Sequence, residues 1–246
     1  DGFNPVTAID LSANIPFGST TRILQPFVAA PQVDFALQAL MGDPTSPTGV
    51  RLTAASRLRT LQGVATRILF ASDDDSVLHS FTTGPISVAG QSHTEFWVNS
   101  NGSVTFGAGD PSGDPTDAGM LSGPERLALN WRDLDPTAGG EVWVFEEPGV
   151  VEVDYQSVPV IAGPNPSSAF SGRIRFLTTG AVEMEIMGGS VGEAIVGYSH
   201  GSLAGTGGAS DLTAAAPLVM PIPSAAFEHF SANGVQDLLG AVVHLN

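Results

Sequence analysis

The sequence predicts an all-β protein, an antiparallel β-sandwich that follows an N-terminal extension of mixed structure. Apolar and polar residues alternate in short runs, as they do in strands with one buried face. Turn residues separate these runs, and the 29 glycines and 18 prolines favour a turn-rich architecture. With 246 residues and no cysteine, the chain is long enough to bury a core that needs no disulfide bonds.

Residues 1–70 are expected to form the extension, and residues 71–246 the sandwich. Within the extension, 33–41 is compatible with a short helix or a strand, and 53–70 with a helix or two strands, because periodicity does not separate the two in short apolar runs. This segment is apolar and nearly neutral, with five arginines and four acidic residues. We therefore predict that it serves assembly or strand exchange, by adding to the sheet edge of a neighbouring copy.

A steady series of strands is predicted after residue 73. The predicted strands are 77–81, 94–99, 103–106, 126–131, 141–145, 150–158, 171–177, 181–187, 194–199, 225–230 and 241–245. Gly84-Pro85, Asn101-Gly102, Thr179-Gly180 and Gly188-Gly189 mark the reversals between them. Short strands separated by such turns indicate a sandwich or a barrel.

The segment 95–145 carries the strongest local pattern. Phe96, Val98, Val104 and Phe106 alternate with Trp97, Asn99, Ser103 and Thr105. Asn101-Gly102 is expected to supply the two positive-φ positions of a tight hairpin turn. Residues 126–145 repeat this plan, with a strand, an acidic turn and a second strand.

Seven motifs follow one another in the order SDDDSV (72–77), FWVNSNGSVTFG (96–107), ERLALNWRDLDP (125–136), GGEVWV (139–144), VEVDYQSVP (151–159), RIRFLTTGAVEMEI (173–186) and AIVGYSHG (194–201). In this order they resemble the nidogen-like (NIDO-type) extracellular β module and its relatives on bacterial secreted proteins. The resemblance implies a non-catalytic adhesive or matrix-associated module outside the cell. It carries over no catalytic residue and leaves residues 1–70 unexplained.

The charge excludes some partners. The formal net charge is −16, and every cation is an arginine. Such a field repels nucleic acid and anionic membranes, so we expect no nucleic-acid partner. The chain has no apolar run of about eighteen residues, so no transmembrane segment is expected.

One motif suggests catalysis. Gly197-Tyr198-Ser199-His200-Gly201 matches the G-x-S-x-G pattern of serine hydrolases, in which a strand-to-helix turn exposes the serine. The glycine- and serine-rich residues that follow are poor helix formers. We therefore predict that the protein is not an enzyme, and a Ser199-dependent acyl hydrolase is the alternative.

Aspartates in the predicted loops suggest a metal site. Ca²⁺ prefers six to eight oxygen ligands, which loop carboxylates supply. The predicted metal residues are Asp73, Asp74, Asp75, Asp133 and Asp135. The 110–117 loop lacks the ligand spacing of an EF-hand. Aspartate is also an ordinary turn former, and this role is the alternative to a metal site. Apart from a possible Ca²⁺ ion, no cofactor is expected.

Two further residue types leave an alternative open. The five histidines have no paired spacing that would support a zinc site. Trp97, Trp131 and Trp143 lie in predicted strands, where tryptophan is usually packed, and Trp97 is expected to point outward. A Ca²⁺-dependent carbohydrate-binding module is therefore a second alternative. The main prediction is a secreted or cell-surface structural or adhesive module that acts by self-association or by binding a protein partner.

Overall fold

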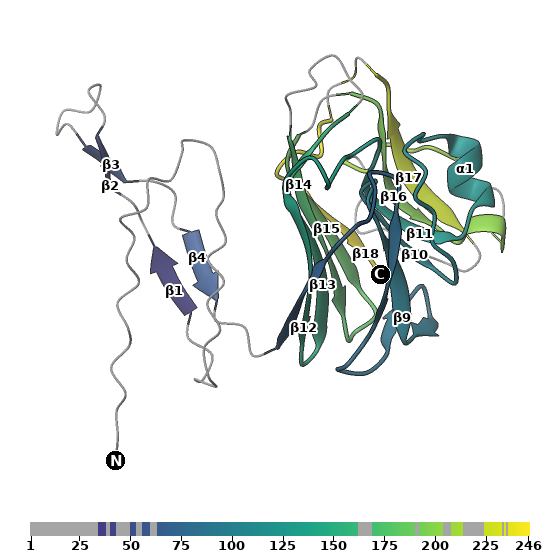
Figure 1. Cartoon of the computed structure of the whole chain (residues 1–246), viewed down its shortest axis with the longest axis horizontal. Helices are drawn as coiled ribbons and strands as arrows, with labels where there is room; N and C mark the ends of the chain where they lie inside the picture. The colour runs from purple at the N-terminus through teal and green to yellow at the C-terminus, as the bar shows by residue number, and fades with distance from the viewer. Residues whose placement is uncertain are drawn as a thin grey trace. The chain divides into compact units, whose positions relative to one another are not determined.

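The computed structural model describes the strands at 34–37, 40–42, 50–52 and 56–59, and then residues 63–161, 169–189, 192–203, 208–213, 224–232, 234 and 236–246. Two six-stranded antiparallel sheets pack face to face as a β-sandwich (Figure 1). The predicted fold class is confirmed.

Eleven of the twelve strands in these sheets are predicted by the sequence as sandwich strands, and the exception is β5 (Val64–Ile68). The first sheet has the order β17-β16-β11-β10-β9-β6, with bounds Ala225–Phe230, Ala194–Ser199, Glu125–Trp131, Ser103–Phe106, Glu95–Asn99 and Ser76–Ser80. The second has the order β18-β15-β14-β13-β12-β5, with bounds Val242–Leu245, Val182–Gly188, Ala169–Leu177, Val150–Pro159, Glu141–Glu147 and Val64–Ile68. All the strands predicted after residue 73 are present, with small shifts at their ends.

The main core lies between the two sheets, and the alternating residues of β9 and β10 fill part of it. Phe96, Val98, Val104 and Phe106 are buried there, as predicted. Trp97 lies between Phe96 and Val98, so its side chain points to the other face of the sheet. It is partly exposed, which agrees with its predicted outward direction. Alternation therefore identified the buried face of this hairpin correctly.

The turn of the β9–β10 hairpin differs from the prediction. Asn99 pairs with Ser103, so the loop holds three residues, and of the two predicted positive-φ positions only Gly102 has one (75°). A type I turn followed by a left-handed glycine has this form. Glycine is required at this position because a Cβ would lie 2.5 Å from the carbonyl oxygen of Asn130.

The predicted strand–turn–strand plan for 126–145 is wrong in its pairing. β11 and β12 belong to opposite sheets, so the acidic turn between them crosses one end of the sandwich. Leu134 forms an isolated bridge with Val160, and the Asp135 amide donates to the carbonyl of Pro159. The alternation in both strands predicts that each has a buried face, but it does not predict which sheet each strand joins.

A short helix and a short hairpin were not predicted. Helix α1 (Asp117–Ser122) lies on the outer side of the first sheet (Figure 1), where Met120 packs with Trp131 and Phe227 in a second, smaller core. Strands β7 (Ile86–Val88) and β8 (Gln91–His93) form a hairpin whose turn includes Ala89 at a φ of 47°. Alanine rarely adopts this conformation, so Gly90, at a φ of 79°, is the one residue that marks this turn in the sequence.

The N-terminal region contains strands where the sequence left helix and strand open. β1 (Asp34–Leu37) pairs with β4 (Ser56–Arg59), and β2 (Leu40–Gly42) pairs with β3 (Val50–Leu52). β5 joins the second sheet, although it lies within the segment predicted as the extension. The remainder of that segment lies outside the described residues. None of the described helices has the length and apolar character that crossing a bilayer requires.

Candidate functional site

Asn101 ties together three loops at one end of the sandwich. Its side chain is fully buried, and Nδ2 donates to Asp74 Oδ1 (2.7 Å) and to the carbonyl of Pro111. Its Oδ1 accepts a hydrogen bond from the Leu134 amide (2.6 Å). The N-S-N-G turn therefore holds the 72–75 loop, the 108–116 loop and the 133–138 turn, and these carry the aspartates that the sequence singled out.

Asn99 makes a second set of buried hydrogen bonds from the same turn. Its Oδ1 accepts from Ser76 Oγ (2.7 Å) and from the Asp110 amide (3.0 Å). Tyr155, on the facing sheet, donates its hydroxyl to the carbonyls of Asn99 (2.7 Å) and Ser103 (3.1 Å). Buried polar groups are costly unless they are paired, so this network fixes both the loop and the distance between the sheets.

Arg126 and Trp131 hold the 108–116 loop against the outer face of the first sheet. Arg126 forms an ion pair with Asp110, and its guanidinium lies 3.8 Å from the centroid of the Trp131 ring. Burial lowers the pKa of Arg126, against the opposing effect of Asp110. The Trp131 indole donates to the carbonyl of Ser112 (2.6 Å) and is buried. Trp131 therefore packs within the protein and presents no ring for a sugar.

The structure brings some of the predicted metal residues together. Burial raises the pKa of Asp133, and the charges of Asp74, Asp73 and Asp135 raise it further, against the opposing charge of Arg132. The 72–75 loop and the 133–138 turn therefore share one acidic region. This proximity agrees with the predicted grouping, and the metal itself stays a prediction.

Two of these five aspartates already have local partners. Asp75 accepts hydrogen bonds from the amides of Ala71 (2.7 Å) and Ser76 (2.8 Å). Asp135 accepts from the hydroxyl (2.6 Å) and amide (2.8 Å) of Thr137, and these bonds lower its pKa. Both carboxylates act as turn formers, which was the ordinary interpretation of an aspartate in a loop.

A second acidic cluster was missed by the sequence analysis. Asp211, Glu228 and Asp237 place one carboxylate oxygen each within 4.8 Å of one another. Burial raises the pKa of Glu228, the Leu212 amide opposes this shift, and the two aspartates add to it. These residues stand far apart in the sequence and share no motif, so only the fold reveals the cluster.

The Ser199 side chain is not placed as a nucleophile. It is fully buried, and its Oγ accepts a hydrogen bond from the Gly201 amide (3.0 Å). The residues that follow form the short 3₁₀ helix η1 (Gly201–Leu203). No histidine among the described residues is hydrogen-bonded to Ser199 Oγ, so this geometry does not support the hydrolase alternative.

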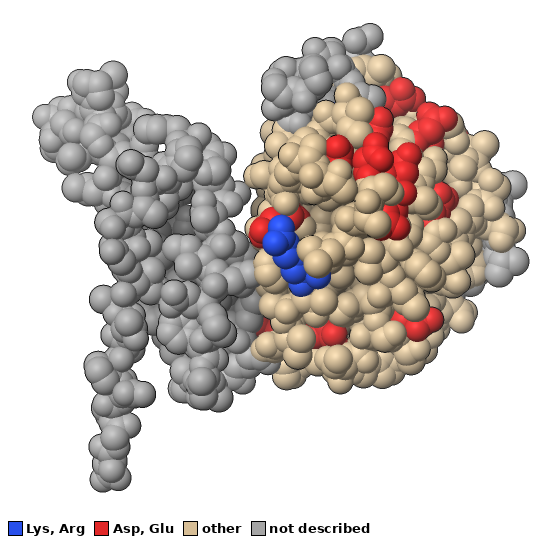
Figure 2. All heavy atoms as spheres, in the orientation of Figure 1, with Lys and Arg blue, Asp and Glu red and all other residues tan. Residues whose placement is uncertain are grey.

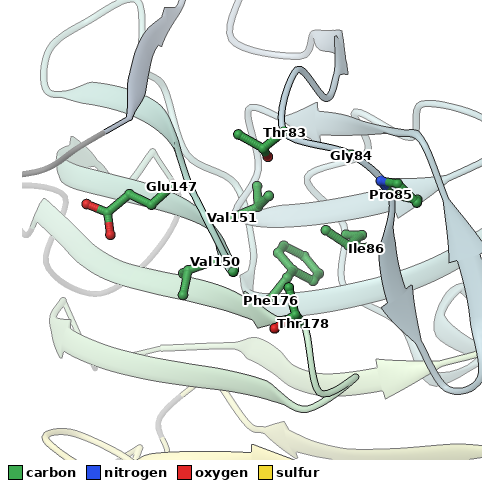
Figure 3. Close-up of a pocket in the computed structure, with 10 residues that line it drawn as sticks. Thr83, Gly84, Pro85, Ile86, Glu147, Val150, Val151, Phe176 and Thr178 are labelled. Atoms are coloured by element: carbon green, nitrogen blue, oxygen red, sulfur yellow. The ribbon is translucent and has the colours of Figure 1, made fainter.

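A small cavity lies at another end of the sandwich, between the 83–86 loop, the β12–β13 turn and the end of β14 (Figure 3). Its volume is about 30 Å³, and Ile86 and Phe176 are among the residues that line it. One water molecule needs about 10–15 Å³ of such free space, so the cavity has room for about two water molecules. The cavity is therefore too small for a substrate.

Comparison of the chain with protein-family models, with curated proteins and with solved structures finds no match. The nidogen-like resemblance therefore stays a prediction.

Proposed function

We propose that this chain is a non-catalytic structural or adhesive module, secreted or displayed at a cell surface, that associates with further copies through its N-terminal strands. One observation carries the proposal. Among the described strands, β1 and β4 pair only with each other, and so do β2 and β3. A lone two-stranded ladder is marginally stable in water, so these strands gain stability from a further strand or sheet.

The sandwich offers sheet edges that an added strand fits. Among the described strands, β5 pairs on one side only, with β12, and β6, β17 and β18 are the edge strands at the other three margins. Val64 at the start of β5 and Leu69 just after it are 49% and 72% exposed. The unpaired amides and carbonyls of an edge strand are a template for strand addition. We therefore assign the strands of 34–59 of one copy to a sheet edge of the next.

The surface supports a protein partner or a cation more than a nucleic acid. Acidic side chains gather on the upper part of the described surface in Figure 2, and basic ones occupy one small area of that view. Among the described side chains, Arg67, Arg126, Arg173 and Arg175 form ion pairs with acidic residues. In this part of the chain the pairs neutralise four arginines that would otherwise attract phosphates.

Light scattering coupled to size-exclusion chromatography tests the proposal. The full chain is expected to associate with increasing concentration, and a chain that begins at Gly63 is expected to stay monomeric. A full-length Ala36→Pro variant removes one backbone amide from β1 and should weaken association without changing the melting temperature of the sandwich. The same oligomeric state for all three chains at every concentration would refute the assembly mechanism.

A Ser199→Ala variant separates this proposal from the hydrolase alternative. We expect the variant and the wild type to hydrolyse short-chain esters at the same background rate. A wild-type rate well above that of the variant would favour the enzyme.

A further inference from the structure

His93, Glu125 and His200 come together at one end of the sandwich core. Glu125 begins β11, His200 directly follows β16, and His93 ends β8. In the β11–β16 register Arg126 pairs with Ser199, so Glu125 and His200 are the next residues opposite each other. The β7–β8 hairpin brings His93 to the same place. The three residues come from separate segments, which is why the histidines looked scattered in the sequence.

Each oxygen of the Glu125 carboxylate faces one imidazole. His93 Nε2 lies 3.7 Å from Oε2, and His200 Nδ1 lies 3.7 Å from Oε1. The Tyr198 hydroxyl donates to Oε1 (2.9 Å) and lies 3.2 Å from His200 Nδ1. The side chains of His93, Glu125 and His200 are only 16%, 11% and 10% exposed. The cluster is therefore a nearly enclosed set of two nitrogens and a carboxylate, with a phenol beside it.

These distances leave the imidazoles without a hydrogen bond to the carboxylate. A nitrogen and an oxygen 3.7 Å apart do not form one, but two ligands about 2.1 Å from a tetrahedral ion lie about 3.4 Å from each other. His93 Nε2 is buried and has no hydrogen-bond partner, a state that buried polar atoms seldom keep.

We infer that His93, Glu125 and His200 bind a divalent transition-metal ion of the Zn²⁺ type, with the Tyr198 hydroxyl or a water molecule as fourth ligand. Two imidazoles and one carboxylate suit Zn²⁺, whereas Ca²⁺ takes oxygen ligands. No choice of one donor atom from each of these three residues brings all three atoms within 4.8 Å of one another, so the two rings must turn toward each other to share one ion. The ion would join β8 to β11 and β16 in a chain that has no disulfide bonds. This site is independent of the proposed assembly.

Titration of the metal-free full chain with Zn²⁺, followed by calorimetry, tests the inference. We expect one ion per chain, and Co²⁺ in its place should give the visible absorption bands of a four-coordinate site. His93→Ala and His200→Ala should each weaken Zn²⁺ binding by more than about 10–100-fold, the usual cost of losing even an outer partner of a metal ligand. His229→Ala is the matched control, because His229 also lies between two carboxylates, those of Asp117 (2.6 Å) and Glu193 (3.4 Å).

Two outcomes would overturn the inference. One is the absence of both a Zn²⁺ heat and Co²⁺ bands in the wild type, in which case the cluster is a set of polar contacts without a metal. The other is binding that survives both cluster variants, or that is lost in His229→Ala alone. If a cluster variant does not fold, the ring nitrogen shifts of the wild-type histidines with and without Zn²⁺ still decide, because coordination must change those of His93 and His200 and leave those of His229 unchanged.

Discussion

Asn101 is a buried polar residue whose side-chain hydrogen bonds all go to other loops. Replacing it by alanine removes three bonds at once and leaves the amide of Leu134 without its acceptor. We predict that Asn101→Ala lowers the free energy of unfolding by about 1–3 kcal/mol, the usual cost of an unsatisfied buried group. Urea unfolding measures this difference, with the exposed Gln91→Ala as a control that should change little. A cost equal to that of the control would contradict the role of Asn101 in holding the loops.

Glu146 is also a buried residue whose side chain bonds to another loop, and it carries a charge. Its buried carboxylate accepts hydrogen bonds from the amides and hydroxyls of Thr82 and Thr83 and lies 3.0 Å from His79 Nε2. Burial acts to raise its pKa, but these bonds outweigh burial and the pKa lies below the ordinary 4.5. Because the unfolded chain binds this proton more tightly, the stabilisation is present above about pH 4.5 and is lost as the pH falls through the folded pKa.

We therefore predict that Glu146→Gln lowers the free energy of unfolding by about 1.5–3 kcal/mol at neutral pH, and that the difference from wild type shrinks once the carboxylate is protonated. Urea unfolding at a series of pH values measures both effects. The exposed Glu95→Gln is the control and should show neither. A Glu146→Gln deficit that stayed constant down to about pH 3 would show that packing, and not the charge, is responsible.

At the scale of the element, the bulge in β13 stores strain at one residue. The β13–β14 register shifts between Tyr155 and Val158, and Ser157 within this shift has a φ of 51° and an exposed side chain. An L-residue in this conformation costs about 1–2 kcal/mol, more than the flexibility that glycine adds to the unfolded chain. We predict that Ser157→Gly raises the free energy of unfolding by up to about 1 kcal/mol and that Ser157→Val lowers it. Ser92→Gly, on exposed β8, is the control and should be mildly destabilising.

The elements also show what sequence patterns can and cannot predict. Alternation located the sandwich strands because each buries one face, and the Thr179-Gly180 turn correctly joined β14 to β15. Alternation does not name the partner strand, so β11 and β12 were placed in one unit although they lie in opposite sheets. Helix α1 is too short, at six residues, for a periodic pattern. Both clusters missed in the sequence depend on sheet order, which brings distant segments together only after folding.

At the scale of the whole molecule, the net charge of −16 affects every experiment with cations. Any salt screens the repulsion among the acidic residues and stabilises the fold, so a rise in melting temperature with Ca²⁺ proves nothing without a control of equal ionic strength. A specific site adds a term that grows with occupancy and reaches about 2.7 kcal/mol at one hundred times the dissociation constant. This difference gives the predicted Ca²⁺ site a clear test.

We predict that Ca²⁺ raises the melting temperature beyond NaCl of matched ionic strength, and that Asp133→Asn removes the excess while Asp237→Asn keeps it. Asp133 belongs to the acidic region that Asn101 gathers, and Asp237 belongs to the separate cluster with Asp211 and Glu228. Differential scanning fluorimetry of the three proteins measures the excess. If only Asp237→Asn removes it, the ion binds the second cluster and the sequence predicted the wrong loops. No excess at about 10 mM Ca²⁺, above the dissociation constants of most extracellular sites, would mean that these aspartates serve the turns alone.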